Sequence, residues 1–287
     1  MNYRCPKCQS PKYHSHGRYW RKSDSKIIIR FRCYNCSYTF SQATFSDCYQ
    51  QNKRRVNSMV GKMLCSGVSQ RRIALLLKIT RKTVQRKLIF LAKIAQKNHL
   101  SFLSSLKDDE LSEVQMDDLI TSHHTKLKPL SLSVAVTTKS RYILAAELSQ
   151  IPAFGHLASL SRKKYGRRKN ELGEKLEGLY QELRKILPKQ GLIDTDEHQL
   201  YPIMIEKHLS GWRHRRFKSL KATVAGQGEL KSKRRDPLFS INHTLAMMRA
   251  NINRLFRRTW NTTKNPQMLL HHLWLYIEFH NRVLIRI

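Results

Sequence analysis

The stretch Val114-Gln115-Met116-Asp117-Asp118-Leu119 decides how the rest of the chain is interpreted. Its apolar residues alternate, which predicts a strand, and its two aspartates lie where that strand is expected to end. Six acidic residues crowd into the eleven positions 108–118, although the chain holds 54 Lys and Arg against 20 Asp and Glu. Carboxylate oxygens are the ligands that Mg²⁺ prefers. The stretch therefore indicates a candidate metal site, with an acidic surface turn as the alternative.

The composition favours a folded protein with a polyanionic partner. The chain has 287 residues, is 40% hydrophobic and carries a formal net charge of +34. Clustered Lys and Arg gain affinity for nucleic acid by releasing the counterions of its phosphates. An anionic membrane is the weaker alternative, because no apolar run reaches transmembrane length and the first residues do not form a signal peptide. We therefore expect a cytoplasmic protein whose cysteines stay reduced.

The strongest motif is a pair of Cys-x-x-Cys knuckles near the N-terminus. Cys5 and Cys8 form the first knuckle, and Cys33 and Cys36 form the second, 24 residues further on. Four thiolates fill the tetrahedral shell of one Zn²⁺ and leave no open position, so the expected site is structural. The pattern predicts a zinc ribbon over residues 1–48.

The segment 49–106 has the apolar spacing of helices and predicts a helix-turn-helix. Ser69 is placed to cap one helix, and the next begins at Arg81 and turns Val84 and Leu88 inward. This arrangement exposes four side chains to a DNA major groove: Arg81, Lys82, Gln85 and Arg86. The alternative is a helical hairpin with a solvated basic face.

Residues 107–287 alternate strands and helices and predict a larger α/β domain. Strands are expected at 113–118, 130–137, 141–148, 191–196 and 220–225. Helices are expected at 171–187, 201–209, 238–259 and 268–282. With its two N-terminal modules, the chain is expected to be an α+β multidomain protein.

This order of elements is that of an RNase H-like mixed sheet, in which the first and fourth strands lie side by side. Asp117 and Asp196 should then meet at one end of the sheet and hold two Mg²⁺ or Mn²⁺ ions for phosphodiester chemistry. Asp194 is a competing position on the same face of its strand, but Asp196 is preferred because it lies at the strand's end.

The chain also resembles a known family, the bacterial insertion-sequence transposases of the first-numbered group. The resemblance is carried by both Cys-x-x-Cys knuckles, Phe40-Ser41-Gln42-Ala43-Thr44, Gln115-Met116-Asp117-Asp118, Thr195-Asp196, and Ile241-Asn242 through Arg257-Arg258. It implies a zinc ribbon, a helix-turn-helix and a DDE catalytic domain, with the first two catalytic aspartates at Asp117 and Asp196. It also implies that the protein is associated with the bacterial nucleoid.

One departure from the family concerns its catalytic glutamate, which aligns with Asn242. The neighbouring His243 can also bind a metal, although adjacent helical residues point about 100° apart and are not expected to face one ion together. Glu229 and Asp236 are further candidates for the third ligand. Arg249 lies on the same helical face as Asn242 and is placed to hold a phosphate.

These observations predict a metal-dependent DNA transposase. It would bind the terminal inverted repeats of its element, cleave there, and join the freed 3′ hydroxyl to target DNA as a homodimer or higher assembly. The alternative is a non-catalytic DNA-binding regulator derived from such an enzyme. An RNase H-like resolvase is a third possibility, but it does not explain the N-terminal modules.

Overall fold

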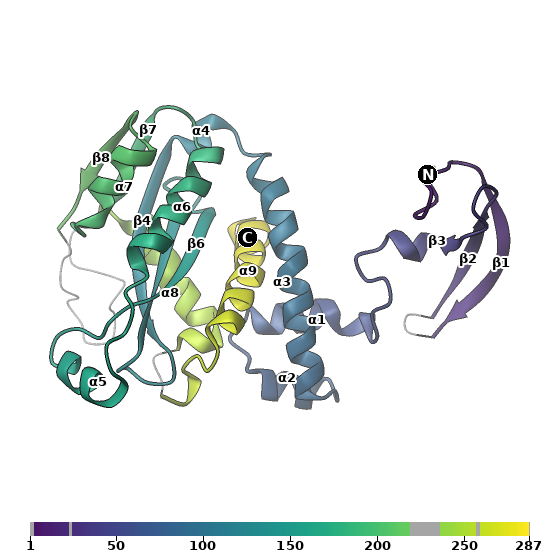
Figure 1. Cartoon of the computed structure of the whole chain (residues 1–287), viewed down its shortest axis with the longest axis horizontal. Helices are drawn as coiled ribbons and strands as arrows, with labels where there is room; N and C mark the ends of the chain where they lie inside the picture. Colours follow the sequence, from purple (N-terminus) through teal and green to yellow (C-terminus); the bar gives the residue numbers. More distant parts are fainter. Residues whose placement is uncertain (1–2, 23–24, 219–235, 257–258, 287) are drawn as a thin grey trace. The chain divides into compact units, whose positions relative to one another are not determined.

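The chain folds into two compact units, Met1–Val60 and Gly61–Ile287. The computed structural model describes residues 3–22, 25–218, 236–256 and 259–286 (Figure 1). The division falls inside α1 (Asn57–Leu64). The expected domain boundaries after residues 48 and 106 stay predictions.

The N-terminal unit is a small antiparallel sheet next to the four cysteines. Its strands are β1 (Tyr13–Arg21), β2 (Lys26–Cys33) and β3 (Thr39–Ser41), in the order β1-β2-β3. Single helical turns follow at η1 (Gln42–Phe45) and η2 (Arg54–Val56). The buried centre of the sheet consists of Cys5, Cys33 and Phe40 with a few rings around them. So small a core needs a further cross-link to be stable, and a metal can supply it.

The larger unit is built on a five-stranded mixed sheet in the order β6-β5-β4-β7-β8. The strands are β4 (Glu113–Ser122), β5 (Pro129–Thr137), β6 (Ile143–Gln150), β7 (Gly191–Thr195) and β8 (Trp212–Arg216). β4, β5 and β6 pair as an antiparallel meander. β7 then pairs parallel to β4, and β8 parallel to β7. The strand that carries Asp117 is therefore central.

The two faces of β4 meet different partners. Val114 and Met116 belong to a buried apolar cluster with α6 (Leu172–Ile186) and α7 (Leu200–His208). Gln115 points to the opposite face, where its Oε1 accepts a hydrogen bond from the backbone N–H of Ile241 at 3.1 Å. Ile241 lies in α8 (Phe239–Asn251), which packs against β4 and β5 on that face of the sheet (Figure 1).

Further helices complete the unit. They are α2 (Gln70–Leu76), α3 (Arg81–Leu103), α4 (Asp108–Leu111), α5 (Leu157–Tyr165) and α9 (Pro266–Arg282), with short turns η3 (Asn253–Leu255), η4 (Thr259–Asn261) and η5 (Leu284–Arg286). α3 packs against α9, and His99 on α3 bonds through Nε2 to the Leu144 carbonyl on β6 at 2.9 Å. The C-terminal half of α3 is thereby part of the core of the larger unit.

Local caps explain where the two helices of the expected helix-turn-helix begin. Ser69 accepts a hydrogen bond from the Arg72 N–H, and Thr80 accepts one from the Thr83 N–H. Both hydroxyls satisfy donors that the first helical turn leaves open. The expected start of the second helix at Arg81 is confirmed.

Two expected boundaries are wrong, and one strand of the sheet was not expected. β4 continues to Ser122 because it pairs with β5 as far as Pro129, so Asp117 and Asp118 lie inside the strand. The fifth strand of the described sheet is β8, whose sequence Trp-Arg-His-Arg-Arg lacks an apolar alternation. α8 ends at Asn251, although Ile252 and Leu255 beyond it remain buried. The strand expected at 220–225 lies outside the described residues.

Candidate functional site

The four cysteines form a compact cluster in the N-terminal unit. Their sulfur atoms all lie within 4.8 Å of one another, and Cys5–Cys36 and Cys8–Cys33 are each 3.5 Å apart. In each knuckle the residue after the second cysteine is left-handed, Gln9 with φ 58° and Ser37 with φ 55°. Its N–H donates to the carbonyl of the first cysteine. The two knuckles thus present their sulfurs in the same way, as one tetrahedral site requires.

The backbone around the sulfurs favours thiolates at part of the cluster. Burial opposes ionisation of Cys33, but the N–H groups of Cys36 and Asn35 lower its pKa to about 7. The N–H of Ser10 lowers the pKa of Cys8, yet the neighbouring Cys36 sulfur helps raise it to about 12. The four thiols therefore cannot all ionise easily by themselves, and a bound cation would remove this conflict. These donors fit a structural Zn²⁺ ion.

The second candidate site lies where β4 and β7 run side by side. Their parallel register pairs Gln115 with Asp194 and Met116 with Thr195. Asp117 and Asp196 are the next residues along the two chains. Because side chains alternate along a strand, Asp117 follows the direction of Gln115 and lies on the α8 side of the sheet, whereas Asp196 lies just beyond the end of β7. The expected juxtaposition of the two strands is thus present.

Asp118 points to the opposite face, into the cluster beneath α6 and α7. Burial raises the pKa of Asp118, and the hydrogen bond that the Ser133 hydroxyl donates to it offsets this only in part. The fully buried Tyr201 has a pKa raised by burial and, further, by the charges of Asp118, Asp117 and Asp196. All three carboxylates therefore lie close to this α7 ring.

The competing residue Asp194 is held by an ion pair. Arg215, its register partner on β8, donates from Nε to Oδ1 at 2.8 Å and from Nη2 to Oδ2 at 2.9 Å. Both carboxylate oxygens are thus used, and the Asp194 side chain is only 4% exposed. Asp196 instead accepts a hydrogen bond from the His198 N–H at 2.9 Å, which shapes the turn after β7.

The two candidates for the third ligand have separate partners. The buried Asn242 donates from Nδ2 to Oδ2 of Asp236 at 2.6 Å. His243 accepts from Nη1 of Arg141 through Nδ1 at 3.0 Å, and burial and that cation lower its pKa. Among the described residues, the four cysteines are the only group of three or more His, Cys, Asp or Glu that could hold a metal. Glu229 lies outside the described residues.

The expected DNA-contacting residues are on accessible surfaces. Arg81, Lys82, Gln85 and Arg86 are all exposed at the start of α3. Arg249 extends from α8 to the Ile120 carbonyl, which its Nη2 approaches to 3.3 Å. Their roles, and those of the candidate metal ligands, stay predictions.

The sequence pattern assigned His198 and Tyr201 no role in the site, and Arg254 was expected inside an arginine-rich helix. The charge of His198 lowers the pKa of Asp118, and its ring lies 5.4 Å from that of Tyr201. Only their closeness in sequence to Asp196 could have pointed to His198 and Tyr201. Arg254 lies beyond the helix end, where helical spacing gives no guide.

Comparison with known proteins identifies one relationship. The chain is 34% identical over 88 residues to the insertion element iso-IS1N protein InsA of Shigella dysenteriae, covering 89% of that protein. The chain belongs to the family of insertion-element InsA proteins. The match takes up 31% of the chain, so most of its length lies outside it. No family model matches the chain. Within the described residues, no helix is both long and apolar enough to span a bilayer.

Proposed function

We propose that the chain is a DNA transposase that binds the ends of an insertion element and performs metal-dependent strand cleavage and strand transfer. The observation that supports the proposal most is the parallel β4–β7 pairing, because Asp117 directly follows Met116 and Asp196 directly follows Thr195, the last registered pair. Membership of an insertion-element family supports the biological setting. The catalytic role goes beyond what this match of 88 residues shows.

The topology of the larger unit supports an RNase H-like catalytic domain. Its first three strands form an antiparallel meander, and the fourth strand lies parallel beside the first. In this arrangement a carboxylate on the central strand and one at the end of its parallel neighbour face the same space. The arrangement therefore suits a pair of carboxylates that act on one phosphate.

The donor set fits Mg²⁺ or Mn²⁺. Asp117 and Asp196 would hold the ions, because carboxylate oxygens suit hard cations that share their shell with substrate phosphates. Such ions, bound as a pair, activate a water or hydroxyl and stabilise the leaving oxygen. Arg249 of α8 contacts the carbonyl of Ile120, which lies three positions after Asp117 on β4. From there Arg249 would hold the adjoining phosphate of the DNA strand.

Asp236 is the candidate we favour for a third carboxylate, and Asn242 is the residue that holds it. Gln115, two positions before Asp117 on the same face, donates from Nε2 to the Pro237 carbonyl at 2.8 Å. This bond holds Pro237, just before α8, on the Gln115 side of β4. Asn242 then positions the Asp236 carboxylate by its 2.6 Å bond.

The N-terminal modules would supply recognition of the element ends. Zn²⁺ at the four cysteines would hold the ribbon, and Arg81, Lys82, Gln85 and Arg86 would enter the DNA. Paired element ends would require a homodimer or higher assembly. The net charge of +34 supports binding of DNA without identifying its sequence.

A non-catalytic DNA-binding regulator is the second candidate. It is favoured by the extent of the family match, 88 residues, and by the amide of Asn242 at the position aligned with the catalytic glutamate. Both candidates bind DNA, so only cleavage separates them.

The deciding experiment is cleavage of duplexes that carry the DNA ends flanking this gene, with Mg²⁺ or Mn²⁺. Asp117→Asn and Asp196→Asn should abolish nicking and leave binding intact, because each removes a metal ligand but no basic residue. Asp109→Asn is the matched control, since its side chain is 85% exposed and belongs to the same acidic segment. Absence of nicking by the parent protein with either ion would leave the regulator as the function.

A further inference from the structure

Two neighbouring hollows in the larger unit share the residue Ala153. The first has a volume of about 570 Å³ and is lined mainly by α5 and the segment after it. The second has a volume of about 720 Å³ and lies among the end of β4, the loop 153–157 and residues 249–262. Together we call them the strand groove. It lies within one compact unit, so its shape does not depend on how the two units are arranged.

The strand groove is strongly cationic. Arg162, Arg167, Arg168 and Lys169 line its first hollow, and Lys126, Arg249 and Arg254 line its second. The guanidinium groups of Arg168 and Arg254 are partly desolvated by burial, which lowers the pKa of each. In the part of the chain that the structure describes, neither Arg162 nor Arg167 is bound to a carboxylate, and both are exposed.

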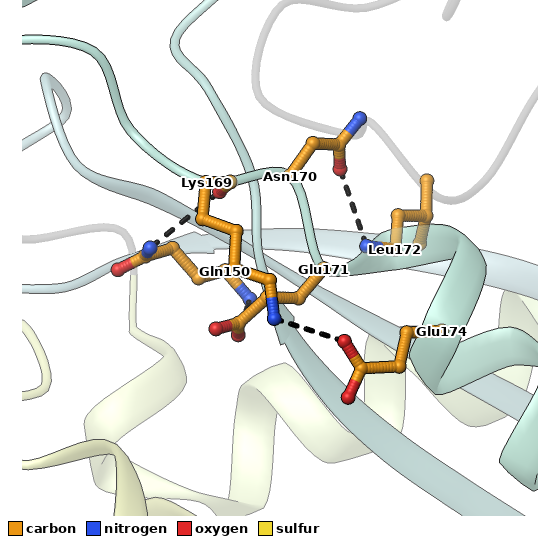
Figure 2. A network of polar contacts seen from close by, with 6 residues as sticks. All are labelled: Gln150, Lys169, Asn170, Glu171, Leu172 and Glu174. Atoms are coloured by element: carbon orange, nitrogen blue, oxygen red, sulfur yellow. Dashed lines mark hydrogen bonds and ion pairs between the residues drawn. The ribbon is translucent and has the colours of Figure 1, made fainter.

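The carboxylates near the groove are engaged elsewhere. Lys169 donates to Oε2 of Glu174 at 2.9 Å, while Oε2 of Glu171 accepts from the Gln150 N–H at 3.3 Å (Figure 2). Asn170 caps the start of α6 by accepting from the Leu172 N–H at 3.2 Å (Figure 2). This network anchors the basic segment to the sheet, and Glu174 pairs with Lys169. The exposed Arg162 and Arg167 take no part in it.

An apolar surface adjoins these cations. Phe154 lines the second hollow and is 62% exposed, and Leu157 and Phe256 line it too. An exposed ring among guanidinium groups is the combination on which unpaired bases stack while their phosphates bind cations. A paired base inside a duplex cannot present its face to such a ring.

The groove begins close to the candidate metal ligands. Ile120 lines the second hollow and lies three residues after Asp117 on β4, which is about 10 Å at 3.3 Å per residue. Arg249 joins the two places by its contact with the Ile120 carbonyl. A DNA strand held at Asp117 would therefore reach the hollow within a few nucleotides.

We propose that the strand groove binds an unpaired DNA strand next to the cleavage site, with a base on Phe154 and phosphates on Arg249, Arg254, Arg162 and Arg167. The inference rests on the proposed function for the position of the cleavage site. It adds that the DNA next to this site is bound as an unpaired strand. The loop 153–157 and α5, which no sequence motif marked, thereby become a DNA-binding element.

The test compares a blunt duplex with the same duplex carrying a six-nucleotide single-stranded tail, by fluorescence anisotropy in buffer without Mg²⁺. Phe154→Ala should weaken binding of the tailed DNA by about fivefold or more and leave the blunt duplex unchanged, since one base loses its stacking partner. Phe154→Trp should retain the preference. Arg162→Ala with Arg167→Ala should make the salt dependence for the tailed DNA shallower by about 1.4 in log–log slope.

Matched controls are Ile203→Ala, an apolar side chain on α7 that is 57% exposed, and Lys185→Ala on α6. Equal losses on blunt and tailed DNA, or no change with Phe154→Ala, would overturn the strand groove. Because no cleavage is measured, an inactive parent protein that keeps the tail preference would refute only the transposase proposal. An active protein without the preference would refute only the groove.

Discussion

Asp117 and Asp118 are neighbours in sequence but have opposite surroundings. The alternation of the strand sends Asp117 to the α8 side and Asp118 under α6 and α7, beside Ser133 and Tyr201. A metal ligand must stay ionised and reachable, whereas burial raises the pKa of Asp118. We therefore propose Asp117 as the metal ligand, whereas Asp118 packs beneath α6 and α7.

This contrast gives a prediction for Asp118→Asn. The folded-state pKa of Asp118 is raised, so the folded protein binds its proton more readily than the unfolded chain does, and ionisation costs stability as pH rises above the ordinary aspartate range. The neutral amide should remove that cost and still accept the Ser133 hydrogen bond. Thermal unfolding should show a midpoint at neutral pH that is unchanged or higher, with the gain shrinking as pH falls. A lower midpoint at pH 7 would show that the charged carboxylate is needed.

At the scale of elements, most of the sheet was predictable because buried strands have apolar runs. Expected strands at 130–137 and 141–148 correspond closely to β5 and β6, and the helix expected at 171–187 to α6. β8 was missed because three of its five residues are arginines and only Trp212 is buried, so its sequence has no apolar alternation. The ion pair between Arg215 of β8 and Asp194 of β7 is a tertiary contact that sequence spacing does not reveal.

The candidate site was predictable only to the level of its strands. The expected parallel neighbourhood of β4 and β7 is present, whereas the meeting of Asp117 and Asp196 at one metal site stays a prediction. The partners of Asn242 and His243 were not readable, because Asp236 and Arg141 meet them through loop and helix packing. Sequence spacing along one helix carries no information about those contacts.

The zinc ribbon gives an element-scale prediction. Cys33→Ser should remove one of four ligands and unfold the short sheet β1–β3, because its core holds few buried side chains. Limited proteolysis should then cut the first 60 residues rapidly, while the larger unit keeps its protection. Metal analysis of the parent protein should give one zinc per chain. Cys65→Ser, which alters a buried cysteine outside the cluster, is the control. A protein without zinc that keeps the ribbon protected would contradict the assignment.

On the scale of the whole molecule, the net charge and the exposed basic start of α3 both favour a polyanionic partner. A net charge of +34 strengthens binding to any DNA, whereas the exposed start of α3 is expected to recognise the element ends. The double variant Arg81→Ala, Arg86→Ala should weaken binding to the ends about tenfold or more, with a shallower salt slope if both residues contact phosphates. Binding to random duplex should fall less. Lys185→Ala with Arg184→Ala on α6 controls for the lost charge. Equal binding of both DNAs by the parent and the double variant would exclude the helix-turn-helix assignment.

The central claim is that β4 and β7 together hold divalent ions for DNA cleavage. The most direct measurement is anomalous scattering from crystals of the full chain with Mn²⁺ and an element-end duplex. The account predicts Mn²⁺ peaks bridging the Asp117 and Asp196 carboxylates, on the α8 side of the sheet, with two ions about 3.5–4 Å apart. Asp117→Asn crystals should lose these peaks. Mn²⁺ bound elsewhere, with none between Asp117 and Asp196, would contradict the account.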